Sequence, residues 1–190
     1  MIILASASPR RKQLMEEEIS PSFIIEVPHI DESLSFKNYH DVQDIVQDIS
    51  LRKCLEIAKN RPTDLVIAAD TVVVIDDEII GKPKDEEDAY MILQKLSNRE
   101  HYVYTGYALK RNDVLVQGIV KSTVLFNKLD DTLIRDYIAS GSPLDKAGAY
   151  GIQDNERFPI VKKISGSKNN IIGFPTDEIK ADLNKYFNAF

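Results

Sequence analysis

Apolar and polar positions along the 190-residue chain alternate between a period typical of strands and a period typical of helices. Strand-like and helix-like segments follow one another, which favours an α/β class. The strongest strand pattern is Leu65–Ile75. Further strands are expected at residues 2–5, 23–27, 79–80, 102–109, 114–126 and 160–164. Helices are expected at residues 8–18, 38–59 and 130–139. Asp85 is expected to cap a further helix, whose apolar face is Ala89, Ile92, Leu93 and Leu96. A last helix is expected after Pro175, where the apolar stripe is Ile179, Leu183, Tyr186, Phe187 and Phe190.

Length and composition limit the domain organisation and the partners of the protein. A chain of 190 residues fits one domain, residues 1–190, or two small lobes around one site. Acidic residues outnumber basic ones by 30 to 24, giving a net charge of -6, which argues against a general nucleic-acid binder. No segment approaches the ~20 apolar residues that span a bilayer, and the apolar start lacks the leading charge of a signal peptide. We therefore expect a cytoplasmic protein with no membrane or nucleic-acid partner.

The segment that begins at Ser8 combines a helix start with positive charge. Ser8 suits an N-cap and Pro9 suits the first helical position. Arg10, Arg11 and Lys12 follow, although cations in a first turn oppose the helix dipole by roughly 0.3–1 kcal/mol each. A bound phosphate would reverse that cost, whereas a solvated basic helix start would tolerate it. Both interpretations stay open at this point.

Three further charged residues interrupt apolar surroundings or fixed loops. Asp70 lies inside the apolar strand pattern 65–75, where a carboxylate needs a partner or caps a nearby turn. Lys53 falls within the apolar stripe of helix 38–59, so its ammonium either reaches the edge of the helix or enters a site. Lys82, between Gly81 and Pro83, points toward an anion or lies in a solvated turn. Without a nucleophile–histidine pair, the carboxylates and cations suit metal-assisted attack of water on a phosphoanhydride.

Four segments together resemble the Maf family of nucleoside triphosphate pyrophosphatases. These are Leu4-Ala5-Ser6-Ala7-Ser8-Pro9-Arg10-Arg11, Ala69-Asp70-Thr71-Val72-Val73, Gly81-Lys82-Pro83 and the run from Pro143 to Gln153. They occur in family order and cover nearly the whole chain. The resemblance implies a mixed twisted sheet flanked by helices, with two lobes around a central cleft, as in inosine triphosphate pyrophosphatases. It also implies hydrolysis of a nucleoside triphosphate to the monophosphate and pyrophosphate with a divalent cation, Mg or Mn.

The resemblance also implies roles for individual residues. Asp70 is the expected proton acceptor that activates water, and Glu32 is expected to bind the metal together with Asp70. The residues expected to set base specificity are Arg10, Thr71 and Gln153. The residues expected to bind the triphosphate are Ser8, Arg11, Lys53 and Lys82.

The branch of the family is indicated by two runs. Ala-Asp-Thr at residues 69–71 and Ala-Gly-Ala-Tyr-Gly-Ile-Gln at residues 147–153 are similar to the dTTP/UTP branch. The alternatives are a pyrophosphatase of the 7-methyl-GTP or inosine-triphosphate type and a nucleotide-binding regulator of septum formation. Two positions depart from the family pattern, Asn98 where glycine is common and Lys168 where an aromatic residue is usual. A homodimer is a further expectation.

Overall fold

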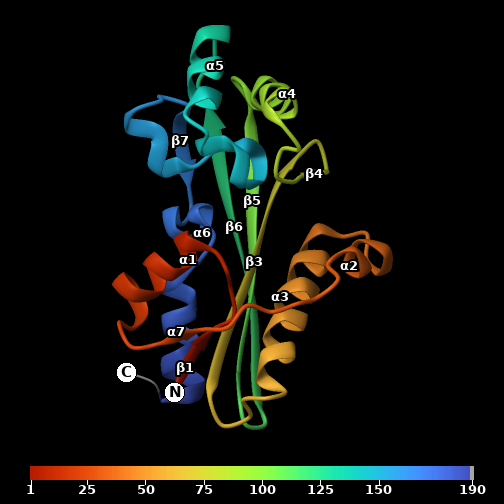
Figure 1. Cartoon of the computed structure of the whole chain (residues 1–190), viewed down its shortest axis with the longest axis vertical. Coiled ribbons are helices and arrows are strands. Elements are labelled where there is room, and N and C mark those ends of the chain that lie inside the picture. Colours follow the sequence, from red (N-terminus) through yellow and green to blue (C-terminus); the bar gives the residue numbers. More distant parts are fainter. Residues whose placement is uncertain (189–190) are drawn as a thin grey trace. The chain divides into compact units, whose positions relative to one another are not determined.

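The computed structural model describes residues 1–188, and in these residues a seven-stranded mixed sheet forms the framework (Figure 1). The strand order is β2-β1-β3-β5-β6-β7, with β4 paired to β3. β1 pairs in parallel with β2 and β3, whereas β3–β4 and β6–β7 are antiparallel. The strands are β1 (Ile2–Leu4), β2 (Ile24–Ile25), β3 (Leu65–Ile75), β4 (Glu78–Ile80), β5 (Glu100–Arg111), β6 (Val114–Phe126) and β7 (Val161–Ser165). The expected mixed α/β sheet flanked by helices is confirmed.

Helices connect these strands, and aspartate side chains begin three of them. Asp41, Asp85 and Asp130 each accept a hydrogen bond from a backbone N–H in the first turn, as N-cap residues do. The helices are α1 (Pro9–Leu14), α2 (Ser33–Asn38), α3 (Val42–Ala58), α4 (Glu86–Leu96), α5 (Asp131–Ala139), α6 (Lys168–Ile172) and α7 (Thr176–Phe187). Shorter turns are η1 (Met15–Ile19), which is π-helical, and the 3₁₀ turns η2 (Ser142–Asp145), η3 (Ala147–Ala149) and η4 (Ile152–Glu156).

The chain divides into two compact units. Unit 1 contains residues 1–71, 105–120 and the segment from Gly173 onward, and unit 2 contains residues 72–104 and 121–172. The long strands β3, β5 and β6 each contribute residues to both units. That residues 1–190 act as a single domain stays a prediction.

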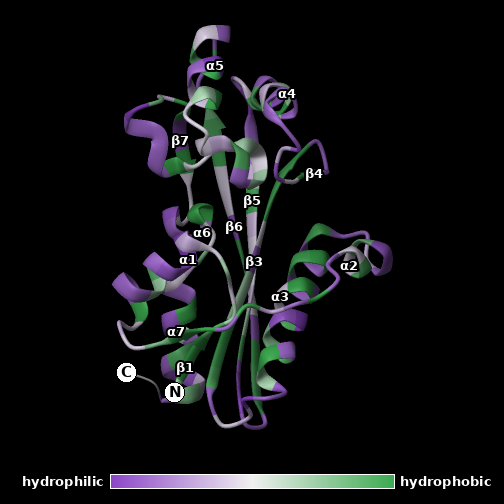
Figure 2. Cartoon of the chain, in the orientation of Figure 1, coloured by the Kyte–Doolittle hydropathy of each residue, from purple (hydrophilic) through white to green (hydrophobic). Residues whose placement is uncertain are grey.

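Unit 1 has an apolar core between α3 and the sheet. Ile3 of β1, Val66 of β3 and Ile57 of α3 belong to one buried cluster. Figure 2 shows β1 and β3 coloured as hydrophobic along most of their length. Alternate residues of β5 face opposite sides: Ala108 joins the α3 cluster, whereas Tyr107 donates a hydrogen bond to Asp182 of α7. The helices α3 and α7 therefore cover opposite faces of this part of the sheet (Figure 1).

Unit 2 has its own core. It combines the end of β3 with β5, β6, α4, α5 and the 3₁₀ turns, and its largest fully buried side chains include Tyr137 and Phe126. His101 is also fully buried, and its Nε2 is 2.8 Å from the hydroxyl oxygen of Tyr150. Each unit therefore buries a separate set of apolar side chains.

The structure corrects the sequence expectations in three places. The helix expected at residues 38–59 begins only at Val42, because Asp41 caps α3, and the separate short helix α2 before it was not expected. The first helix ends at Leu14 and continues as the π-helical turn η1, closed by a hydrogen bond from Ser20 N to Met15 O. In the expected stripe of α7, Tyr186 is exposed, and Phe190 lies outside the described residues.

No helix among residues 1–188 has both the length and the apolar character needed to cross a bilayer.

Candidate active site

Two polar residues of β3 stand where its parallel pairing with β1 has ended. β1 pairs with β3 up to Leu4 and Ile67, and Ala5 N still donates to Ile67 O at 2.8 Å. Beyond this point β3 continues with Asp70 and Thr71, whereas β1 ends and the loop to α1 begins. Ligand sites of α/β sheets form at the carboxyl ends of parallel strands. The strand pairing therefore places Asp70 within β3, just beyond the carboxyl end of its parallel pairing with β1, where such sites occur.

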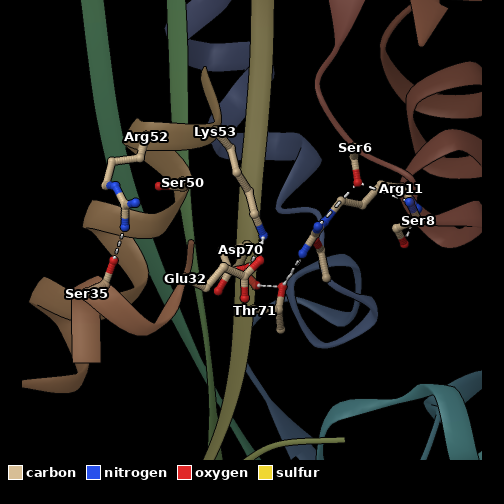
Figure 3. Close-up of polar contacts among 12 residues, drawn as sticks. Ser6, Ser8, Arg11, Glu32, Ser35, Ser50, Arg52, Lys53, Asp70 and Thr71 are labelled. Atoms are coloured by element: carbon tan, nitrogen blue, oxygen red, sulfur yellow. Dashed lines mark hydrogen bonds and ion pairs between the residues drawn. The ribbon is translucent and has the colours of Figure 1, made fainter. Parts of the chain in front are cut away.

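Lys53 joins two carboxylates in this region of unit 1. Its Nζ lies 2.7 Å from Asp70 Oδ1 and 2.7 Å from Glu32 Oε1 (Figure 3). The Lys53 and Asp70 side chains are 14% and 13% exposed, whereas Glu32 is 49% exposed. The two carboxylates thus converge on a single cation position, which the Lys53 ammonium occupies. The Lys53 ammonium therefore contacts these two carboxylates, and its role in a functional site stays a prediction.

Burial makes Asp70 a stronger base than an aspartate in water. Desolvation raises the pKa of Asp70 and exceeds the opposing effects of Lys53 and Arg11, while the charge of Glu32 raises it further. A carboxylate with a raised pKa accepts a proton more readily at neutral pH. The environment of Asp70 is therefore suited to general-base chemistry.

The Arg11 guanidinium lies beside Asp70 but is held by uncharged partners (Figure 3). Its Nε donates to Gly173 O at 2.8 Å, its Nη2 to Thr71 Oγ1 at 3.1 Å and its Nη1 to Ser6 Oγ at 3.4 Å. Burial lowers the pKa of Arg11, and the negative charge of Asp70 opposes that effect. An oriented, partly buried cation whose acceptors are neutral favours binding of an anion.

Thr71 connects this arginine to residues to which the sequence analysis assigned no role. Thr71 Oγ1 is 2.9 Å from Thr105 Oγ1 and 3.3 Å from Gly173 O. Gly173 has φ +116°, and a Cβ there would lie 3.2 Å from Thr71 Oγ1. Glycine is needed for this backbone conformation and for the close approach. The uneven placement of glycine, five of eight beyond residue 140, is the signal that could have found Gly173. Ser6 lies inside the matching run 4–11 without an assigned role, and nothing in the sequence indicated Thr105.

Ser8 caps α1 as expected: its Oγ accepts from Arg11 N at 3.4 Å. Arg10 is half-buried in the first turn of the same helix. Because α1 has only six residues, the case for an anion site here rests on the side chains of Arg11 and Lys53 and not on the helix dipole.

Two of the expected site residues belong to unit 2. Lys82 is exposed in the loop after β4, and Gln153 is exposed in η4. The segment that carries Gln153 is well anchored within unit 2, because Tyr137 Oη donates to Asp154 Oδ2 at 2.6 Å and accepts from Gly151 N at 2.9 Å. Whether Lys82 and Gln153 join the residues of unit 1 stays a prediction.

The donor set around Asp70 fits a hard divalent cation. Residues 1–188 contain no group of three or more His, Cys, Asp or Glu side chains arranged to hold a metal. Mg²⁺ in phosphate-processing sites is commonly bound by one or two carboxylates, with substrate phosphates and water completing its shell. Asp70 and Glu32, which already share one cation, provide such a pair.

A mixed α/β sheet with paired carboxylates and an oriented arginine beyond the carboxyl end of β1 defines the class of a phosphate-binding α/β enzyme. The model of the family described as Maf-like protein matches residues 1–186, and the chain belongs to that family. Members of this family are generally metal-dependent.

Curated relatives agree with this assignment. A dTTP/UTP pyrophosphatase of Clostridium botulinum (strain Alaska E43 / Type E3) is 41% identical over 186 residues, covering 96% of this chain and 97% of the relative. One from Geobacillus sp. (strain WCH70) is 44% identical over 174 residues, covering 92% and 91%. Among solved structures, a HAM1 protein from Coxiella burnetii is 14% identical with a TM-score of 0.47, covering 97% of this chain and 98% of that one.

Proposed function

We propose that this protein is a nucleoside triphosphate pyrophosphatase that hydrolyses dTTP and UTP to the monophosphate and pyrophosphate. The observation that carries the proposal is the position of Arg11 and Lys53 beside the carboxylates of Asp70 and Glu32. The names of relatives 41% and 44% identical over more than nine-tenths of this chain supply the substrate.

The first part of the mechanism is binding of the triphosphate. The Arg11 guanidinium can exchange its contact with Ser6, the longest of its three at 3.4 Å, for a phosphate oxygen while Gly173 O still orients it. Lys53 and the Ser8 hydroxyl are the other proposed phosphate ligands in unit 1. Their positive charge and hydrogen bonds stabilise the charge that develops on the leaving pyrophosphate.

The second part is activation of water by Asp70. Lys53 engages Oδ1, so Oδ2 is the oxygen proposed to accept a proton from the attacking water. The water oxygen bonds to the α-phosphorus, the bond between that phosphorus and the α–β bridging oxygen breaks, and the electron pair leaves with the pyrophosphate. Asp70 holds the proton until solvent removes it. The raised pKa of Asp70 favours this transfer.

Asp70 and Glu32 are the proposed ligands of the divalent cation, with Mg²⁺ or Mn²⁺ as the proposed ions. When bound, such a cation lowers the pKa of water and offsets phosphate charge. Lys53 contacts one oxygen of each carboxylate, so a cation that took the position of the ammonium would displace it from at least one of them. The ammonium would then be available to the triphosphate.

Base recognition is proposed to involve Arg10, Thr71 and Gln153, and Lys82 is proposed to bind phosphate. The Gln153 amide can both donate and accept, which suits the edge of uracil or thymine. The Thr71 hydroxyl is already bonded to Arg11 and Thr105, so a contact to a base requires it to give up one of these bonds. We also propose a cytoplasmic location, and a homodimer stays a prediction.

The experiment is to measure pyrophosphate release from dTTP and UTP by wild type, Asp70→Asn and Asp77→Asn. Asp77 is exposed in a turn with φ 59°, which asparagine adopts readily, so Asp77→Asn is a matched control. We expect Asp70→Asn to lose at least about 100-fold in kcat, since general-base catalysis contributes that much, while its melting temperature stays near that of wild type. Retained turnover in Asp70→Asn would remove Asp70 from the mechanism.

A wild type that binds UTP but does not hydrolyse it would instead favour the regulator of septum formation, an alternative that the names of the relatives do not favour.

A further inference from the structure

The short helix α2 carries Glu32 at its start, yet apolar packing does not hold α2 in place. Ser35 is its single buried side chain, whereas Leu34 and Phe36 are 42% and 46% exposed. Burial of apolar area usually fixes a surface helix against its neighbour. Another set of contacts must therefore determine where Glu32 lies.

That set is a polar bracket between α2 and α3, formed by Ser35, Asp48, Arg52 and the backbone of Asp31 (Figure 3 shows Arg52 bonded to Ser35). Ser35 Oγ donates to Asp48 Oδ2 at 2.6 Å and accepts from Arg52 Nη1 at 3.0 Å. Arg52 Nη2 donates to Asp31 O at 2.9 Å. The guanidinium thus holds the carbonyl of the peptide bond that joins Asp31 to Glu32.

Adjacent residues of α3 therefore hold Glu32 from two directions. Arg52 binds the backbone before Glu32, and Lys53 binds its side-chain oxygen at 2.7 Å. Lys53 must release a carboxylate oxygen when a cation takes the shared position, whereas the contacts of Arg52 are to groups that do not bind the cation. Arg52 can therefore keep Glu32 in place both before and after a cation binds.

We propose that Arg52 is a positioning residue that fixes Glu32 as a cation ligand through Ser35 and the Asp31 carbonyl. The inference rests on the proposed function, in which Glu32 and Asp70 bind the cation. Residues that orient metal ligands typically change metal affinity by roughly 10–100-fold when removed. Loss of Arg52 should therefore weaken cation binding without removing any ligand.

The test is Mn²⁺ affinity of the nucleotide-free protein, measured by electron paramagnetic resonance for wild type, Arg52→Gln, Arg52→Lys, Ser35→Ala and Glu32→Gln. Arg61→Gln is the matched control, since Arg61 bonds Glu26 in the same unit. We expect Arg52→Gln to weaken Mn²⁺ about tenfold, Ser35→Ala to weaken it less, Arg52→Lys to recover part of the loss and Arg61→Gln to match wild type.

A double variant separates positioning from a general loss of structure. If Arg52 acts through Glu32, Arg52→Gln should add less than about twofold to the loss already caused by Glu32→Gln. An equal loss in both backgrounds, or unchanged affinity in Arg52→Gln, overturns the inference. Melting curves identify a variant that fails to fold, and Ser35→Ala then carries the same test. If Glu32→Gln itself binds Mn²⁺ as wild type does, the cation site of the proposed function has failed instead.

Discussion

Replacing Lys53 with methionine removes the ammonium between Asp70 and Glu32 but keeps an apolar side chain of similar length. At 2.7 Å, and with an effective dielectric constant of about 20, each contact has a Coulomb energy of about 6 kcal/mol. Desolvation of the three charges offsets much of this, and breaking a buried pair costs about 3–5 kcal/mol in practice. Since Glu32 is half-exposed and contributes less, we expect a loss of about 3 kcal/mol.

The assay is thermal unfolding followed by circular dichroism, first in a metal chelator and then with Mn²⁺. For a chain of this size, 3 kcal/mol corresponds to a fall of about 6–12 °C in the melting temperature. Lys95→Met is the matched control: Lys95 pairs with Glu78 on the surface, so its loss should change the melting temperature by less than about 2 °C.

Manganese should then raise the melting temperature of Lys53→Met more than that of wild type, because in the variant no ammonium occupies the position between the two carboxylates. The reasoning is refuted if Lys53→Met melts with wild type in chelator, or if Mn²⁺ shifts both proteins equally.

Two further predictions concern stability. Burial lowers the pKa of His101 from 6.5 to about 4. Between these two pH values His101 is neutral in the folded state but protonated in the unfolded state. The free energy of unfolding is therefore highest above about pH 6.5 and falls by about 3 kcal/mol as the pH drops toward 4. In urea unfolding at pH 7.5 and 4.5, His101→Gln should lose less of its free energy of unfolding than wild type does. Equal losses would contradict the lowered pKa of His101. In Gly106→Ala, the new Cβ would lie 2.7 Å from Val46 O, so α3 must shift, and we expect about 2 kcal/mol of destabilisation. Urea unfolding should show almost no loss in Gly81→Ala, whose Cβ meets nothing within 4 Å, and an equal effect of both substitutions would argue against the close packing of α3 on β5.

The parts of the fold that the sequence predicted best are those where pattern and burial agree. The strand Leu65–Ile75 has the bounds expected from its continuous apolar run. Asp85 caps α4 as expected, because capping is a local interaction. Asn98 adopts φ +56°, the left-handed conformation expected where relatives have glycine. The helix α2 was missed because it buries no apolar side chain and so leaves no period in the sequence.

The same distinction applies to the candidate site. Asp70 and Lys53 were recognisable because each is a charge within an apolar pattern. The partners of Arg11 were not, since Thr71 and Gly173 lie 60 and 162 residues away along the chain. Arg52 was invisible for the same reason: its contacts to Ser35 and Asp31 depend on how α2 packs against α3. The apolar pattern around a charged residue is visible in the sequence, whereas its contacts with distant residues depend on the tertiary structure.

The central claim is tested most directly by the products formed from UTP and dTTP, identified by phosphorus NMR alongside 7-methyl-GTP and inosine triphosphate. The account predicts the monophosphate and pyrophosphate in equal amounts, with kcat/KM for UTP and dTTP above that for the other two nucleotides. Release of a diphosphate and inorganic phosphate, or a preference for 7-methyl-GTP or inosine triphosphate, would contradict it.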